Sequence, residues 1–138
     1  MTIVFRGCGT TVKKWFLCLS IVFALDTQAA SLCAEKRQLH IEYFRCLDQE
    51  LEKVQREVQS WENSHLFRLE ELEKNTGRGE PLRVFQRSRN EFQKFSTDHC
   101  RWQYLALIPD SQAGTGAFKE CMLQQLQIQV TILQQIKY

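Results

Sequence analysis

The sequence predicts an all-α protein, a disulfide-stapled helical bundle or hairpin of about three main helices that follows a cleaved signal peptide. Three observations support this prediction. A short apolar segment near the N-terminus follows basic residues, four cysteines lie beyond it, and apolar residues recur every three or four positions along most of the remaining chain. Such spacing predicts helices, and an even number of cysteines in a small exported protein predicts disulfide bonds.

The N-terminal segment has the order of a secretory signal peptide. A mostly apolar run, residues 15–25, follows basic residues and precedes small residues. We expect cleavage after Ala29, with Ala30 as the second choice, so that residues 1–29 form the signal peptide. The alternative is a membrane anchor, but a helix of this length spans only about 16 Å, against roughly 30 Å of membrane hydrocarbon.

Residues 30–138 are expected to form a single domain. Loss of the signal peptide removes three basic residues and one acidic residue, which leaves 15 of each and a formally neutral chain. No basic stripe interleaved with aromatic residues remains, so we expect no nucleic-acid partner and, after cleavage, no membrane span. A domain of roughly this length buries a modest core, and disulfide bonds add to its stability.

Apolar residues at helical spacing predict a first long helix over residues 39–74. Charged residues fill its other face, and His65 lies in the apolar stripe, where we expect it at the edge of the core. Gly77 and Pro81 are typical of a helix end and of the start of the next helix. The stripe consists of Phe44, Leu47, Leu51, Val54, Val58, Trp61, Leu69 and Leu72.

Two further helices are expected, over residues 81–107 and 117–137, with a turn-rich loop at residues 109–116 between them. The inward side of the second helix is expected to consist of Phe85, Phe92, Phe95, His99, Trp102 and Ala106. One face of the third helix consists of Phe118, Met122, Leu126, Val130 and Leu133.

The third helix has two ambiguous features. Residues 126–132 also alternate between apolar and polar, which is a strand signal, but no partner strand is visible elsewhere and we expect a helix. A second apolar row consists of Ile128, Ile132 and Ile136. We expect this row to pack on another helix of the chain; the alternative is a contact between two copies of the protein.

Four cysteines allow three pairings, and the expected helices narrow the choice. Cys100 and Cys121 lie at similar distances from the turn between the second and third helices, so a disulfide would lock that hairpin. Cys46 does not face Cys100 and is left to pair with Cys33. In one straight helix these two would be about 20 Å apart, whereas a disulfide requires Cα atoms within roughly 7 Å. We therefore expect a turn at about residues 36–40.

The cysteines stand in a recognisable order of motifs. Cys33 and Cys46 precede the polar segment LDQELEKVQ, and FQRSRNEFQKFSTDHC ends at Cys100. Next come Gly114-Thr-Gly116, Phe118 three residues before Cys121, and the closing segment MLQQLQIQVTILQQI. This order resembles the LprI-type lysozyme-inhibitor family of small exported bacterial proteins over nearly all of residues 30–138. The chain departs from the family's usual residues at Phe92, Ser96, Thr97 and Gln129.

The resemblance implies an exported, non-enzymatic protein with a protein partner, lysozyme, whose active-site cleft it would occlude. A loop held by a Cys100–Cys121 disulfide would be pre-organised, which lowers the entropy cost of binding. The acidic residues 70–73 with Glu80 form a second candidate surface. The candidate partner-binding loop consists of Asp110, Ser111, Gln112, Gly114, Thr115 and Gly116.

Other chemistry has less support in the sequence. The pair His99-Cys100 suggests a nucleophile or metal ligand, but a cysteine of an exported protein is expected in a disulfide. No zinc-ligand spacing occurs, and the carboxylates lie on a charged helix face without an acid–base arrangement. We expect no catalytic residue, metal or cofactor, and a periplasmic or secreted protein. The alternative function is a structural or assembly protein of the bacterial envelope that acts through an exposed helical face.

Overall fold

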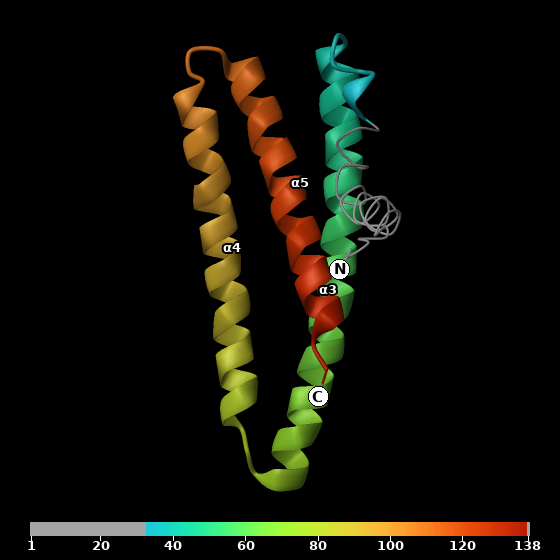
Figure 1. Ribbon diagram of the computed structural model, residues 1–138, viewed down its shortest axis with the longest axis vertical. Helices are drawn as coiled ribbons and strands as arrows, with labels where there is room; N and C mark the ends of the chain where they lie inside the picture. Colours follow the sequence, from blue (N-terminus) through green and yellow to red (C-terminus); the bar gives the residue numbers. More distant parts are fainter. Residues whose placement is uncertain (1–32, 138) are drawn as a thin grey trace, which may run out of the picture.

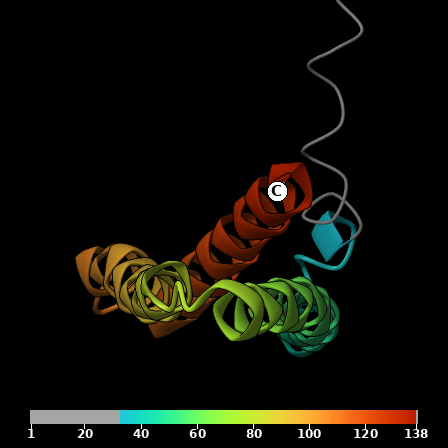
Figure 2. The same cartoon turned by 90° about the horizontal axis from the view of Figure 1, so that it is seen from below.

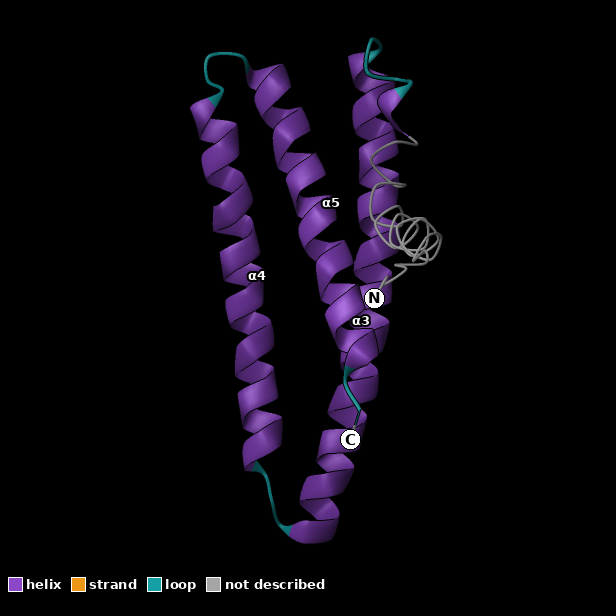
Figure 3. Cartoon of the chain, in the orientation of Figure 1, coloured by secondary structure: helices purple, strands orange, loops and turns teal. Residues whose placement is uncertain are grey.

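The computed structural model describes residues 33–137, and this part of the chain contains three long helices and no strand. Helix α3 spans His40–Thr76, α4 spans Glu80–Ala106 and α5 spans Ser111–Gln135 (Figure 1, Figure 3). The predicted all-α class is confirmed. The predicted signal peptide, residues 1–29, lies outside the described residues.

Successive helices run in opposite directions, with the α3–α4 turn at one end of the molecule and the α4–α5 turn at the other (Figure 1). Figure 2 shows α5 on one side of the α3–α4 pair. Helix α5 packs against both other helices, whereas α3 and α4 have far less contact with each other. In the described part of the chain, no helix is both long and apolar enough to cross a membrane.

The core lies mainly between α3 and α5. Leu47 of α3 and Leu123 of α5 are fully buried, and so is Leu133 near the end of α5. Burial of one such side chain contributes about 1.5–3 kcal/mol. The same cluster includes Tyr43, Val54, Val58, Leu126 and Val130.

The chain turns before α3, as the cysteine spacing predicts. Cys33 and Cys46 are joined by a disulfide with Cα atoms 5.8 Å apart. The turn is held by backbone hydrogen bonds, from Lys36 N–H to Cys33 O (2.9 Å) and from Leu39 N–H to Lys36 O (2.8 Å). Gly77 caps the end of α3. Its φ of 73° is left-handed, and its N–H donates a hydrogen bond to Glu73 O.

His65 lies deeper than the core edge predicted for it. Its side chain is only 2% exposed, and Nε2 lies 2.9 Å from the carbonyl oxygen of Leu133. The ring also packs edge-on against Phe85 of α4, with centroids 5.8 Å apart. His65 therefore joins all three helices.

The predicted inward face of α4 is wrong in part. Phe95 and Trp102 are 57% and 58% exposed, and Ala106 is also exposed, whereas Ser96 and Cys100 are buried. The disulfide from Cys100 to α5 turns that position inward, and Ser96, four residues earlier, shares its face. Because neighbouring helical positions differ by about 100°, Phe95 points elsewhere.

Helix α5 differs from its prediction in two respects. It begins at Ser111, so most of the expected loop, residues 109–116, is helical, and Asp110 is the N-cap.

Residues 126–132 are helical, as expected. Ile136 packs against the core, as expected for the second apolar row. Ile128 and Ile132 are instead exposed, because the opposite faces of α5 already contact α3 and α4.

Candidate protein-binding surface at the α4–α5 turn

The turn between α4 and α5 projects at one end of the molecule, and we call residues 105–110 the tip (Figure 1). Leu105, Leu107 and Ile108 are 57%, 42% and 50% exposed. Backbone hydrogen bonds hold this turn, from Leu107 N–H to Tyr104 O (3.1 Å) and from Asp110 N–H to Leu107 O (2.9 Å). The tip therefore presents apolar side chains on an ordered backbone.

Covalent and steric contacts fix the base of the tip. Cys100 and Cys121 are joined by a disulfide with Cα atoms 5.5 Å apart, as predicted. Gly114 lies against Tyr104, so closely that an added Cβ would be 2.8 Å from the ring atom Cδ2. The Asp110 carboxylate accepts a hydrogen bond from Ala113 N–H at 2.9 Å and caps α5.

The six residues predicted to form a binding loop have different surroundings. Asp110, Gln112 and Gly116 line a hollow of about 420 Å³ beside the start of α3. Gly114 is buried, and the Thr115 hydroxyl donates to Ser111 O at 2.8 Å within α5. A helix can begin this early because Asp110 caps it and Gly114 permits close contact with α4. The exposed loop is shorter than predicted and lies nearer α4.

A polar cluster forms one side of this hollow. Arg37 Nη2 lies 2.6 Å from Glu120 Oε1, and the Tyr43 hydroxyl donates to the same carboxylate. Burial raises the pKa of the Tyr43 phenol, and the hydrogen bond to Glu120 raises it further. Hydrogen bonds to Tyr43 and Glu120 raise the pKa of Arg37, which stays a cation. The cluster ties the turn before α3 to α5.

The second predicted surface lies at the opposite end of the molecule, near the α3–α4 turn. Glu70, Glu71 and Glu80 are exposed. The Glu73 side chain instead lies over the α3–α4 turn. Its carboxylate is so close to Gly79 that it would overlap a Cβ atom added at that position. The structure does not bring this acidic group near the tip, so the two surfaces are separate.

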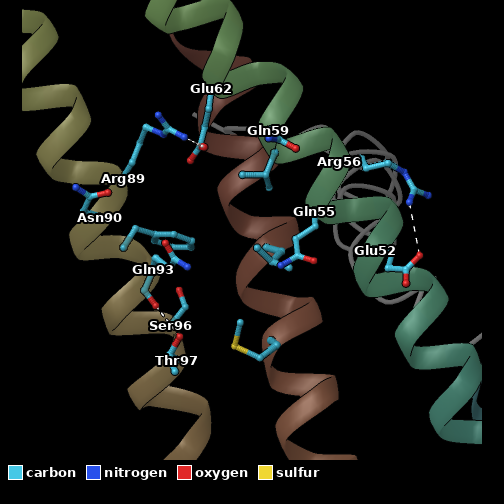
Figure 4. Close-up of a pocket in the computed structure, with 14 residues that line it drawn as sticks. Glu52, Gln55, Arg56, Gln59, Glu62, Arg89, Asn90, Gln93, Ser96 and Thr97 are labelled. Atoms are coloured by element: carbon cyan, nitrogen blue, oxygen red, sulfur yellow. Dashed lines mark hydrogen bonds and ion pairs between the residues drawn. The ribbon is translucent and has the colours of Figure 1, made fainter.

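A groove between α3 and α4 was not predicted from the sequence (Figure 4). It brings together Gln55 and Gln59 of α3 with Asn90 and Gln93 of α4. The available signal was the spacing of these uncharged amides, three and four positions apart, which places each pair on one helix face. Phe92, Ser96 and Thr97, where the chain departs from the LprI-type pattern, also line the groove.

Neither a cluster of metal ligands nor a related protein indicates what these surfaces bind. Within residues 33–137, no three His, Cys, Asp or Glu side chains are grouped to hold a metal ion. The resemblance to the LprI-type family stays a prediction, because comparison of the chain with protein-family models, curated proteins and solved structures finds no match.

Proposed function

We propose that the protein is an exported, non-enzymatic binding protein that inhibits lysozyme by placing the tip in the enzyme's active-site cleft. One observation above all supports this proposal. A projecting turn joins two helices that a disulfide holds together, and it exposes the apolar side chains of Leu105, Leu107 and Ile108. Exposed apolar groups that cluster in this way are typical of a protein-interaction surface.

The tip suits insertion into a cleft because little order must be gained on binding. The Cys100–Cys121 disulfide, the Gly114–Tyr104 contact and the Asp110 cap already hold its backbone. Pre-organisation of this kind lowers the entropy cost of association. The Asp110 carboxylate adds a negative charge that suits a cationic partner.

Two disulfide bonds in the described residues are compatible with a periplasmic or secreted protein, since disulfides persist in oxidising compartments. Lysozyme acts on bacterial cell walls, so an inhibitor would meet it in such a compartment. Export itself rests on the predicted signal peptide of residues 1–29.

A cell-wall lysis assay tests the proposed inhibition. Oxidised protein, residues 30–138, is titrated against several lysozymes, and a double variant, Leu107→Ser with Ile108→Ser, is titrated alongside. Removal of two exposed apolar contacts is expected to weaken inhibition at least tenfold, given about 1.5–3 kcal/mol for each fully buried side chain. Both residues are exposed, so the thermal midpoint should change little.

Phe67→Ser is the matched control, because Phe67 is an exposed apolar residue of α3 outside the tip. It should inhibit like the unchanged protein, and a reduced and alkylated sample should lose inhibition. Equal inhibition by the tip double variant would exclude the tip as the binding surface. Absence of inhibition by the folded, oxidised protein would overturn the lysozyme proposal.

A further inference from the structure

The groove between α3 and α4 has a volume of about 610 Å³, with α5 along its floor (Figure 4). Its floor is apolar and includes Val58, Phe92, Met122 and Leu126. Its walls are lined by side-chain amides from both helices, which donate and accept hydrogen bonds. The groove therefore offers an apolar surface between two rows of hydrogen-bonding groups.

The charged residues of the groove are paired with one another. Arg89 Nη2 lies 2.7 Å from Glu62 Oε2, across the gap between α4 and α3. Arg56 Nη1 lies 3.7 Å from Glu52 Oε2 on the surface of α3. Two positive and two negative side chains leave the groove without net charge. A charged occupant would find no unpaired countercharge there, which favours a neutral one.

Two buried polar atoms in the groove have no hydrogen-bond partner within residues 33–137. They are the hydroxyl oxygen of Ser96, a residue only 1% exposed, and Nε of Arg89. An unsatisfied buried polar group costs about 1–3 kcal/mol. Figure 4 shows the Ser96 side chain on the face of α4 that looks toward the groove. Both residues line the groove, and because both atoms are closed off from solvent, an occupant reaches them only when a neighbouring side chain shifts.

We propose that this groove binds an extended peptide segment that has no net charge. Peptide N–H and C=O groups match the amides of the walls, Ser96 and Arg89 Nε, while alternate side chains would lie on the apolar floor. From Glu52 to Glu62 the α3 wall is roughly 15 Å long, at about 1.5 Å per residue. This length accommodates about four or five extended residues at about 3.3 Å each.

A display library of random heptapeptides, flanked by glycine and serine, is the probe for this proposal. The library is selected on immobilised protein, residues 30–138, after depletion on the variant Gln55→Trp, whose indole would fill the groove from α3. The expected result is enrichment of sequences without net charge and with apolar residues at alternate positions. Enrichment of strongly charged peptides, or no enrichment beyond the depleted background, would overturn the proposal.

The best selected peptide is then titrated into ¹⁵N-labelled protein. Amide shifts are expected at Gln59, Gln93 and Leu126, and Gln55→Trp should weaken binding at least tenfold. Gln49→Trp is the matched control, since Gln49 is an exposed glutamine of α3 outside the groove. Shifts at other sites, or equal loss in both variants, would contradict a groove site. Groove shifts with a neutral oligosaccharide and none with the peptide would contradict the peptide assignment.

Ser96→Ala separates ligand binding from a structural role. Removal of an unpartnered buried hydroxyl should leave the thermal midpoint unchanged or raise it, while peptide affinity falls about fivefold through the lost hydrogen bond. Unchanged affinity would exclude a role for the hydroxyl in binding. The groove is distinct from the tip, so Gln55→Trp should retain lysozyme inhibition, and failure of either proposal leaves the other intact.

Discussion

At the scale of single residues, Gly114 and Gly116 show how neighbouring positions of one helix meet different constraints. Gly114 faces the end of α4, where an added Cβ would lie 2.8 Å from Tyr104 Cδ2 and 3.0 Å from the Tyr104 carbonyl oxygen. Gly116 faces α3, where the nearest atoms, in Tyr43 and Phe44, would be 3.7 Å away. The first glycine permits close helix contact, whereas the second leaves room for a methyl group.

Gly114→Ala and Gly116→Ala should therefore have opposite effects on stability. The first variant should lose about 1–3 kcal/mol, because backbone and ring of Tyr104 must move. The second should be neutral or gain up to about 1 kcal/mol, because alanine favours a helix over glycine. Urea unfolding of both variants measures the difference. Equal free energies of unfolding would show that the Tyr104 contact does not constrain position 114.

At the scale of elements, α4 is the helix with the least burial. Only Ser96 and Cys100 are buried in α4, whereas α3 and α5 contribute the leucines and valines of the core. Helix α4 is held near its ends, by the Cys100–Cys121 disulfide and by the contact of Phe85 with His65. Its middle borders the groove on the side that faces α3, where the Arg89–Glu62 ion pair spans the gap.

Hydrogen exchange should reveal this uneven packing. Regions with few buried apolar contacts open locally at lower free energy than a core. Amides in residues 86–95 of α4 should exchange about tenfold faster than those in residues 47–58 of α3, after correction for intrinsic rates. Mass spectrometry of peptic fragments at neutral pH measures both segments. Equal protection would mean that α4 opens only when the whole domain unfolds.

At the scale of the whole molecule, α5 has an exposed apolar pair that its partners in the bundle do not cover. Ile128 and Ile132 lie one helical turn apart and are 44% and 49% exposed. Because this pair is not packed within the chain, it favours the alternative for this part of the row, a contact between two copies. Envelope assembly through this face of α5 is the second candidate function, and it does not involve the tip or the groove.

Sedimentation velocity tests assembly through Ile128 and Ile132. If two copies associate through this face, the sedimentation coefficient should rise with protein concentration, and Ile128→Ser with Ile132→Ser should abolish the rise. Ile41→Ser is the control, because Ile41 is an exposed isoleucine of α3. A concentration-independent monomer would exclude self-association through this face.

The sequence by itself determined the helical class, the approximate limits of α3 and α4, and the cysteine pairing. These features depend on local spacing and on distances along helices, such as the turn required between Cys33 and Cys46. The periodicity of α5 was also sufficient to favour a helix over a strand at residues 126–132. The residues that would bind lysozyme were predicted only by resemblance and stay a proposal.

Only the tertiary structure decided which face of α4 points inward and where the candidate sites lie. An apolar pattern specifies the inward face of a helix only to within about one position. In α4 the disulfide at Cys100 turns Ser96 inward and leaves Phe95 exposed. The early start of α5 required the contact of Gly114 with Tyr104, and the groove required three helices that diverge. These features arise from contacts between residues far apart in the chain, which local propensity does not encode.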